Sequence, residues 1–256
     1  MKKRIGIIGF GVIGSYLFHK VREEKSMEVE FVFDEDRKKT EVLDPSLVLP
    51  TFDDFEGRNP HLVVEAAVPQ AVRELGLQIL KKSDFLILSL TSLADEAFRQ
   101  EMEKVAKGSG REIYIPHGAI LGLDGIHDGR KVLEKVNITT IKSPKSLGLS
   151  GEGITEPHVV YEGPTREACK RFPRNVNVHA SLALTGLGFD STRSKIVADP
   201  GTKSMMHVIE VTGKGLRWKI EIESRAIGEV TGAYTPESIY QTVRRICLHE
   251  GGLRLA

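Results

Sequence analysis

The sequence predicts an α/β fold in which a doubly wound parallel sheet is followed by a second, α+β unit. In the first half of the chain, apolar runs alternate with amphipathic helical segments, which is typical of a parallel sheet covered on both faces. After Pro116 this alternation ends, and strands cluster with few helices between them. We therefore expect a first domain over residues 1–117, completed by a C-terminal helix within 233–256, and a second domain over 118–232.

The first strand and helix carry the clearest motif. An apolar run over residues 4–9 leads into glycines at the spacing Gly-x-Gly-x-x-Gly, and residues 12–24 have a helical pattern. In a Rossmann-type dinucleotide-binding fold, the first glycine permits a tight turn and the second lets the backbone approach a pyrophosphate. The third lets the helix pack against the strand. The free N–H groups at the N-terminus of that helix then favour the anion. The residues expected at this site are Gly9, Gly11, Val12, Ile13 and Gly14. The alternative is a glycine-rich turn with no ligand.

The next strand, residues 29–33, ends in Asp34, about twenty residues after the last glycine of the motif. An acid at this position binds the ribose diol of NAD and repels a 2′-phosphate. Basic residues that could accommodate NADP follow directly, namely Arg37, Lys38 and Lys39. We therefore predict NAD as the cofactor, with NADP as a second cofactor that these basic residues would permit.

The remaining elements of the first domain continue the alternation. Strands are expected at 61–67, 84–90 and 112–116, and helices at 69–82 and 94–107. The first of these strands ends in Ala66 and Ala67, directly before a helix. Because small side chains at the carboxyl edge of a parallel sheet leave room for a ligand, we expect both alanines to contact the cofactor. A plain strand–helix turn would give the same pattern.

The second domain begins with the small-residue segment 118–125, where we place the boundary. Strands are expected near 137–142, 158–162, 195–198, 206–212 and 216–223, and helices at 165–171 and 176–187. Residues 235–249 predict a closing helix with Pro236 in its first turn. We expect this helix to fold back on the first domain.

Polar residues of the second domain could carry chemistry. Asn175 and Asn177 precede an apolar run too rich in small residues for a surface helix, which indicates a buried helix whose N-terminus could bind a carboxylate. The alternative is that at least one of the two asparagines is a simple N-cap. His207 opens a strand and could transfer protons near neutral pH, although a histidine in such a position is more often structural. His117 and His179 flank the same segments and are further candidates.

Composition and spacing exclude several function classes. The net charge is +1 and the basic residues are dispersed, so no nucleic-acid surface is expected. No run reaches the roughly 20 apolar residues that a membrane span needs, and no His or Cys pair has metal-ligand spacing. Cys169 and Cys247 form no disulfide framework and suit the reducing cytoplasm. The cations that could meet an anionic substrate, or else lie solvated on the surface, are Lys142, Lys145 and Arg193.

Several segments, taken together, resemble the L-aspartate dehydrogenase family. They are residues 9–14, 115–124, 172–180 and 196–199, with His207 downstream, in the family's order and spacing. The resemblance implies that His207 is the active-site residue of an α+β catalytic domain, and that Ala119 and Asn177 contact the cofactor. It also implies NAD(P)-dependent oxidation of L-aspartate to iminoaspartate, which water converts to oxaloacetate and ammonia, and the reverse amination. A role in de novo NAD biosynthesis would follow.

The chain departs from the family pattern at two places. His117 stands where a small residue is expected, and residues 232–238 stand where a segment like Asn-Pro-x-Thr-Ser is expected. One alternative is therefore a related oxidoreductase similar to homoserine dehydrogenase or dihydrodipicolinate reductase. Another is a non-catalytic NAD(H)-sensing protein, which would carry a separate DNA- or protein-binding module. Apolar strands in the second domain favour a homodimer.

Overall fold

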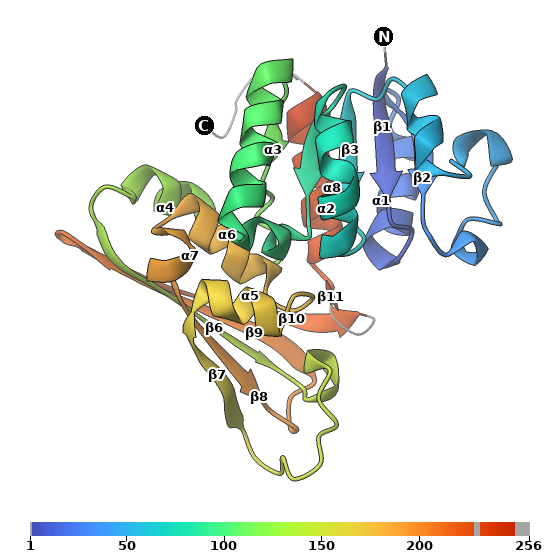
Figure 1. Ribbon diagram of the computed structural model, residues 1–256. Coiled ribbons are helices and arrows are strands. Elements are labelled where there is room, and N and C mark those ends of the chain that lie inside the picture. Colours follow the sequence, from blue (N-terminus) through green and yellow to red (C-terminus); the bar gives the residue numbers. More distant parts are fainter. Residues whose placement is uncertain (1, 228–230, 249–256) are drawn as a thin grey trace.

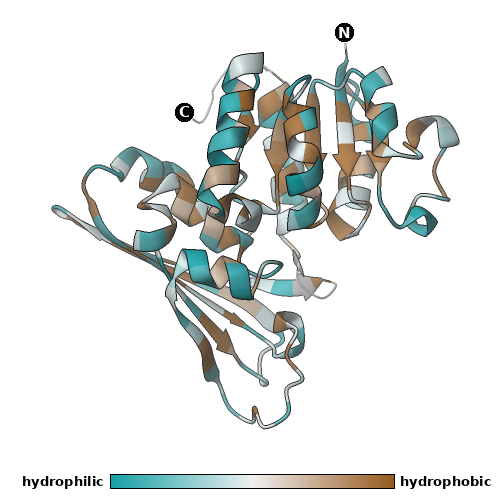
Figure 2. Ribbon diagram, viewed as in Figure 1, coloured by the Kyte–Doolittle hydropathy of each residue, from teal (hydrophilic) through white to brown (hydrophobic). Residues whose placement is uncertain are grey.

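The computed structural model describes residues 2–227 and 231–248, which form two sheets with helices around and between them (Figure 1). The N-terminal half forms a five-stranded parallel sheet with strand order β2-β1-β3-β4-β5. Its strands are β1 (Lys3–Ile8), β2 (Met27–Phe33), β3 (Leu62–Glu65), β4 (Asp84–Ile87) and β5 (Ile113–Tyr114). The central strands are mostly hydrophobic (Figure 2), as expected for a sheet that is buried on both faces.

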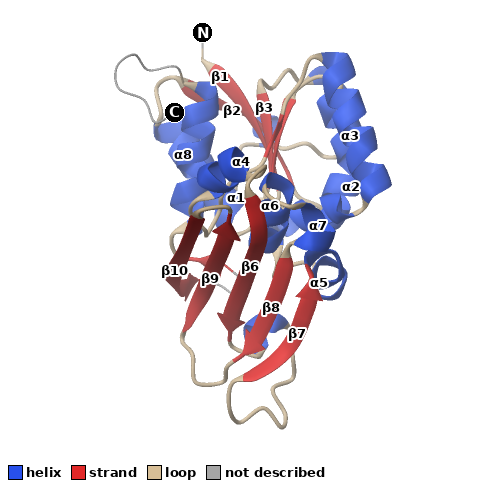
Figure 3. Cartoon of the chain, turned by 90° about the vertical axis from the view of Figure 1, so that its left-hand side faces the viewer, coloured by secondary structure: helices blue, strands red, loops and turns tan. Residues whose placement is uncertain are grey.

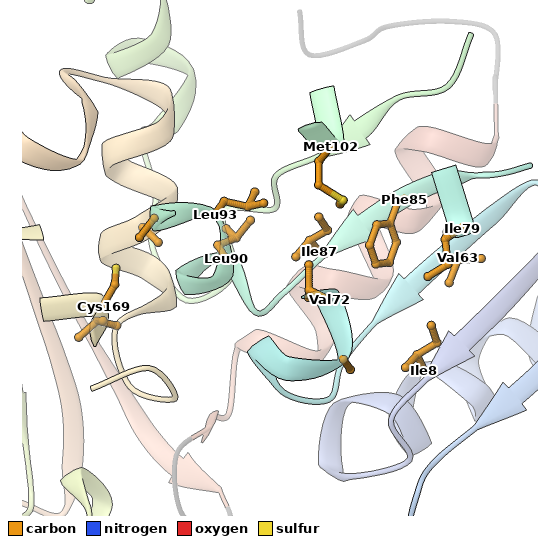
Figure 4. Close-up of a cluster of buried hydrophobic side chains, with 14 of the residues drawn as sticks. Ile8, Val63, Val72, Ile79, Phe85, Ile87, Leu90, Leu93, Met102 and Cys169 are labelled. Atoms are coloured by element: carbon orange, nitrogen blue, oxygen red, sulfur yellow. The ribbon is translucent and has the colours of Figure 1, made fainter. Parts of the chain in front are cut away.

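Helices cover both faces of the parallel sheet, because successive strand residues point to opposite sides. They are α1 (Val12–Glu23), α2 (Pro69–Leu80), α3 (Glu96–Ser109) and α8 (Thr235–Cys247). On one face, Val63 and Phe85 pack with α2 and α3 (Figure 4). On the other face, Val64 and Leu86 pack with α1 and α8, which contact each other. The closing helix therefore packs on the first sheet.

The second half of the chain forms a six-stranded mixed sheet with strand order β11-β10-β9-β6-β8-β7. The strands are β6 (Leu133–Lys142), β7 (His158–Pro164), β8 (Arg193–Ala198), β9 (Ser204–Gly213), β10 (Leu216–Ile227) and β11 (Thr231–Gly232). Strands β6 and β8 run parallel and the other neighbours run antiparallel. One face packs against the helices α4 (Leu123–Gly129), α5 (Thr165–Arg171), α6 (Asn177–Thr185) and α7 (Gly188–Ser191). Figure 3 shows β9, β6 and β8 side by side beneath these helices.

The two halves share one hydrophobic cluster. It begins at Ile8 and Val63 under the first sheet, passes through Leu90 and Leu93, and continues to Ala180 and Ile196 in the second half. The short 3₁₀ helix Leu90–Ala94 is the bridge, because it contacts α2 and α3 on one side and α5 and α6 on the other. No helix within the described ranges is long and apolar enough to cross a membrane.

Some expected elements end or begin elsewhere. The strand predicted over 84–90 ends at Ile87. The Leu88 N–H still reaches the backbone carbonyl of Glu65 on β3, but the next N–H, that of Ser89, is hydrogen-bonded by the Glu65 side chain instead. The segment 118–125, where we placed the domain boundary, contains the start of α4, whose Leu123 and Ile126 are buried. The helix predicted over 176–187 stops at Thr185, followed by Gly188 with a left-handed φ of 82°. The end of the predicted closing helix, residue 249, lies outside the described residues.

Candidate active site

A cavity of about 690 Å³ lies where the carboxyl ends of the parallel strands face the second sheet. This is the edge at which open α/β sheets bind ligands, and the volume suits a small-molecule ligand or cofactor. The sequence-predicted residues that line it are Gly9, Gly11, Val12, Ile13, Asp34, Ala66, Ala67, Ala119, Asn177 and His207. Gly14 does not line the cavity and lies beneath the glycine loop.

The three motif glycines differ in what surrounds them. Gly9 has a φ of 89°, and a Cβ there would lie 2.6 Å from the Ala66 carbonyl oxygen. A Cβ on Gly14 would lie 1.9 Å from the Gly9 carbonyl oxygen, so only glycine lets α1 pack this close to β1. By contrast, a Cβ on Gly11 would meet no atom within 4 Å. The backbone at Gly11 therefore forms an open cradle, at the start of α1, that fits a pyrophosphate.

Asp34 lies beside this loop at the end of β2. Its Oδ2 accepts a 2.7 Å hydrogen bond from the backbone N–H of Phe10, and its Oδ1 accepts one of 2.9 Å from the N–H of Asp36. Lys39 Nζ forms an ion pair with Asp34 at 3.2 Å and also lines the cavity, whereas Arg37 and Lys38 do not line it. The site thus has a carboxylate fixed against the glycine loop, with one cation next to it.

Glu65 is a buried carboxyl residue behind the cavity wall that the sequence analysis missed. It is fully buried at the end of β3, and its carboxylate accepts hydrogen bonds from the N–H groups of Ala67, Leu88 and Ser89 and from the Ser89 hydroxyl. Burial raises the pKa of Glu65, and these donors oppose that effect. The side chain ties together the ends of β3 and β4, both of which line the cavity. The sequence signal that could have indicated this buried acid is its position directly after the apolar run Leu62 to Val64.

Lys142 brings a positive charge into the other end of the cavity. It is 3% exposed at the end of β6, and its Nζ donates a 3.3 Å hydrogen bond to Asn175 Oδ1. Burial lowers the pKa of Lys142 to about 8. The Lys142 side chain points inward because alternate residues of β6 share one face, and Val136, Ile138 and Thr140 on that face are buried. Of the three cations considered in the sequence, Lys142 is the one that lines the cavity, while the other two, Lys145 and Arg193, are exposed and do not line it.

The two asparagines also line the cavity, and the alternative considered in the sequence, that at least one of them is a simple N-cap, is wrong. The N-cap of α6 is Val176, and no side chain caps the helix. Asn177 Oδ1 instead accepts a 3.2 Å hydrogen bond from the Thr91 N–H, and Asn175 Oδ1 is bonded to Lys142. Because both carbonyl oxygens accept protein donors, both amide NH₂ groups remain to donate to a ligand.

His207 lies on β9, 3% exposed, at the end of the cavity that holds Lys142. Its Nδ1 is 2.8 Å from Thr140 Oγ1 on the neighbouring strand. Burial, with a smaller contribution from the positive charge of Lys142, lowers the pKa of His207 to about 3. The imidazole is therefore neutral at pH 7 and can accept a proton.

The segments that depart from the family pattern meet at one wall of the cavity. The His117 ring stacks on Tyr234 with ring centroids 6.3 Å apart, and its Nδ1 lies 3.4 Å from Ser238 Oγ. Nδ1 also lies 3.0 Å from the Ile120 carbonyl oxygen. His117 and Gly232 both line the cavity. His179, the other candidate histidine, is fully buried behind His207 and does not line it.

Comparison with known proteins places this geometry in a family. Residues 124–246 match the model "Aspartate dehydrogenase, C-terminal", and residues 9–116 match "Homoserine dehydrogenase, NAD binding domain". The L-aspartate dehydrogenase of Thermotoga maritima is 36% identical over 94% of this chain and 95% of its own length. The chain belongs to the L-aspartate dehydrogenase family. The enzyme of Nitrosopumilus maritimus in the same family is 32% identical over 96% of this chain and 97% of its own.

Solved structures agree with this family membership. The crystal structure of aspartate dehydrogenase from Thermotoga maritima covers 100% of both chains, with a TM-score of 0.79 and 32% identity. A dihydrodipicolinate reductase and an archaeal homoserine dehydrogenase have TM-scores of 0.55 and 0.60 at 15% and 12% identity, so they share the fold alone. The predicted family, the Rossmann-type α/β fold class and the prediction of a nicotinamide-dependent enzyme are confirmed.

Proposed function

We propose that this protein is an NAD(P)-dependent L-aspartate dehydrogenase that oxidises L-aspartate to iminoaspartate, which water converts to oxaloacetate and ammonia, and that also catalyses the reverse amination. The observation that carries the proposal is a single cavity with a glycine cradle and Asp34 at one end, and with His207 and Lys142 at the other. A dinucleotide and a small anionic substrate would meet between these two ends. Gly9, Gly11, Val12, Ile13, Asp34, Ala66, Ala67, Ala119 and Asn177 would hold the dinucleotide.

The polar end of the cavity suits a dicarboxylate. Lys142 and Arg174 supply positive charge there, and the amide groups of Asn175 and Asn177 supply donors. Lys142 is held by a hydrogen bond in a nearly dry site, where an ion pair with a carboxylate is much stronger than in water. A monocarboxylate such as alanine would leave part of this donor set unused.

His207 would handle the protons of the reaction. When bound, the nicotinamide accepts the hydride that leaves Cα of L-aspartate. Neutral His207 takes a proton from the substrate ammonium, so that the nitrogen lone pair can form the C=N bond as the hydride leaves. Once that first proton has left through the cavity, the same residue can take a proton from the water that attacks the imine carbon.

Substrate binding itself would adjust the basicity of His207. In the free site, the charge of Lys142 helps to keep the pKa of His207 low. A bound carboxylate next to Lys142 offsets that charge and so raises the pKa of His207, while burial, the larger cause of the lowered pKa, remains. The histidine therefore becomes a better base when the dicarboxylate is in place.

Asp34 supports NAD as the preferred cofactor, since its carboxylate would bind the ribose diol and repel a 2′-phosphate. Lys39, ion-paired with Asp34 at 3.2 Å, is the cation placed to tolerate that phosphate. We therefore propose preference for NAD with measurable use of NADP. Fluorescence titration with NADH and NADPH tests this, and tighter binding of NADPH would contradict this role of Asp34.

The decisive assay is NADH formation from L-aspartate, with L-glutamate, L-alanine and L-homoserine as comparison substrates and with NAD and NADP tested separately. Selective turnover of L-aspartate supports the proposal. Binding of NADH without aspartate turnover would overturn it and would point to His117 and residues 232–238, the departures from the family pattern, as the cause.

The proposal extends to the cellular setting. We place the enzyme in the cytoplasm as a homodimer that can supply iminoaspartate for NAD synthesis. The outer face of the second sheet carries partly exposed apolar residues, Ile141, Val159 and Val208 among them, that a second copy could cover. Light scattering on the purified protein tests the dimer, and a monomeric mass would refute it.

A further inference from the structure

His207 is one end of a buried series of hydrogen bonds that crosses the second sheet. Thr140 Oγ1 lies 2.8 Å from His207 Nδ1 and 2.6 Å from His179 Nε2. On the other side of its ring, His179 Nδ1 lies 2.8 Å from Ser194 Oγ. These side chains come from β9, β6, α6 and β8, and each is 3% exposed or less. These hydrogen bonds thus link the paired strands β9, β6 and β8 to one another and to α6 through side chains as well as through the sheet.

The series ends on a backbone carbonyl. Ser194 Oγ lies 2.8 Å from Thr165 Oγ1, which donates a 3.0 Å hydrogen bond to the carbonyl oxygen of Thr192. A carbonyl oxygen can only accept, and a hydroxyl group carries a single proton. Thr165 therefore has no proton left for Ser194, and Ser194 must be the donor between these two hydroxyl groups.

Counting protons in the same way fixes the direction of every other hydrogen bond in the series when both imidazoles are neutral. Burial holds the pKa of His179 well below its usual range, and the pKa of His207 is also lowered. Because Ser194 has used its proton, Nδ1 of His179 must carry the N–H and donate to it, which leaves Nε2 as an acceptor. Thr140 then donates to His179 Nε2, and has no proton left for the other ring. Nδ1 of His207 must therefore carry the N–H that Thr140 accepts.

We infer that this one-directional series, anchored on the Thr192 carbonyl, holds neutral His207 as the Nδ1–H tautomer and presents Nε2 as the basic nitrogen to the cavity. The structural part of the inference stands on the hydrogen-bond geometry; the use of Nε2 as the base rests on the proposed function. Thr140, His179, Ser194 and Thr165 are positioning residues, since they act through His207.

The anchor also decides where the proton can go. A backbone carbonyl has no proton to release and nothing beyond it to receive one, so the series cannot conduct a proton away from His207. A proton taken up at Nε2 must return to substrate or leave through the cavity. The buried groups orient the base and do not form a proton wire.

The distal substitution Thr165→Val tests the inference. The substitution is nearly isosteric, and its site is separated from His207 by Thr140, His179 and Ser194. It removes the hydroxyl group that donates a hydrogen bond to the Thr192 carbonyl. Ser194 then has no obligatory acceptor, so the series can run in either direction and His207 can populate Nε2–H. Two-bond ¹H–¹⁵N correlation spectra of the ¹⁵N-histidine-labelled full chain at pH 7 distinguish the two tautomers. The signals of His207 are assigned with the His207→Gln variant, and Thr165→Ser, which keeps the hydroxyl group, is the matched control.

We expect pure Nδ1–H at His207 in the wild type and in Thr165→Ser, and a mixture in Thr165→Val. An equal mixture would lower kcat for L-aspartate about twofold by halving the competent population, with NADH affinity unchanged. Nε2–H in the wild type, or a wild-type spectrum in folded Thr165→Val, would overturn the inference. If Thr165→Val does not fold, Ser194→Ala removes the acceptor for His179 and should give the same mixture. Because the spectra need no turnover, failure of the proposed function would appear separately, as absent activity with intact tautomer signals.

Discussion

Alanine substitution at two glycines of the same motif should have opposite consequences. At Gly11 the backbone φ is −83°, which any residue adopts, and a Cβ would meet no atom within 4 Å. Gly11→Ala should therefore fold as well as the wild type, or gain up to about 1 kcal/mol from reduced freedom of the unfolded chain. Its methyl group would occupy the cradle, and a clash of about 1–3 kcal/mol there weakens NADH binding roughly 5- to 150-fold.

At Gly14 the same change acts on stability. The added Cβ would lie 1.9 Å from the Gly9 carbonyl oxygen, while real contacts of this kind stay above 3.0 Å, so rigid backbone must move. Overpacking of this kind costs about 1–3 kcal/mol, and in a chain of this size each kcal/mol lowers Tm by roughly 2–4 °C. We therefore expect Gly14→Ala to unfold roughly 2–12 °C below the wild type.

The assays are differential scanning calorimetry and fluorescence titration with NADH, applied to both variants and the wild type. We expect Gly11→Ala to have a normal Tm but weak NADH binding, and Gly14→Ala to have a low Tm. Wild-type NADH affinity in Gly11→Ala would show that the pyrophosphate does not approach this glycine. An unchanged Tm in Gly14→Ala would show that α1 does not need the close contact.

Further substitutions test the rest of the site. His207→Gln should lower kcat by about 10²–10⁴ while NADH binding persists, and near-normal turnover in steady-state kinetics would remove His207 from the mechanism. Lys142→Met should raise KM for L-aspartate by roughly 10- to 150-fold without changing NADH affinity, because a charge-assisted hydrogen bond worth about 1.5–3 kcal/mol is lost. In the wild type, Lys142 loses its proton above its pKa of about 8, so kcat/KM for L-aspartate should fall as pH rises through that value; a flat profile from pH 7 to 9 would contradict its role. Glu65→Gln should lower Tm, since the new NH₂ group faces backbone donors at a cost of about 1–3 kcal/mol; an unchanged thermal scan would show that the carboxylate does not hold the two strand ends.

The parts of the fold and site that could be predicted from sequence are those set by local chemistry. The glycine spacing and Asp34 lie within one strand–helix–strand unit, so their meaning can be read without knowing the rest of the chain. The helix predicted over 94–107 is present but begins at Glu96, because Asp95 is its N-cap and accepts a hydrogen bond from the Phe98 N–H.

The parts that could not be predicted depend on pairing between distant segments. Thr140 meets His207 because β6 and β9 are paired in one register, and it meets His179 because α6 crosses the same sheet face. A shift of one residue in that register would turn each of these side chains to the other face. Similarly, Lys142 is an ordinary lysine in sequence, and its burial depends on the inward face of β6 and on the segment that brings Asn175 next to it.

The hydrophobic cluster that runs from Ile8 through Leu93 to Ile196 has a consequence for motion. A protein whose catalytic cleft opens by a hinge needs an interface between its domains that can separate without exposing apolar surface. Here the short 3₁₀ helix Leu90–Ala94 is buried between the two halves, so separating them would expose hydrophobic residues of both. The two halves should therefore melt in one cooperative transition rather than two, which a calorimetric scan would show as a single peak.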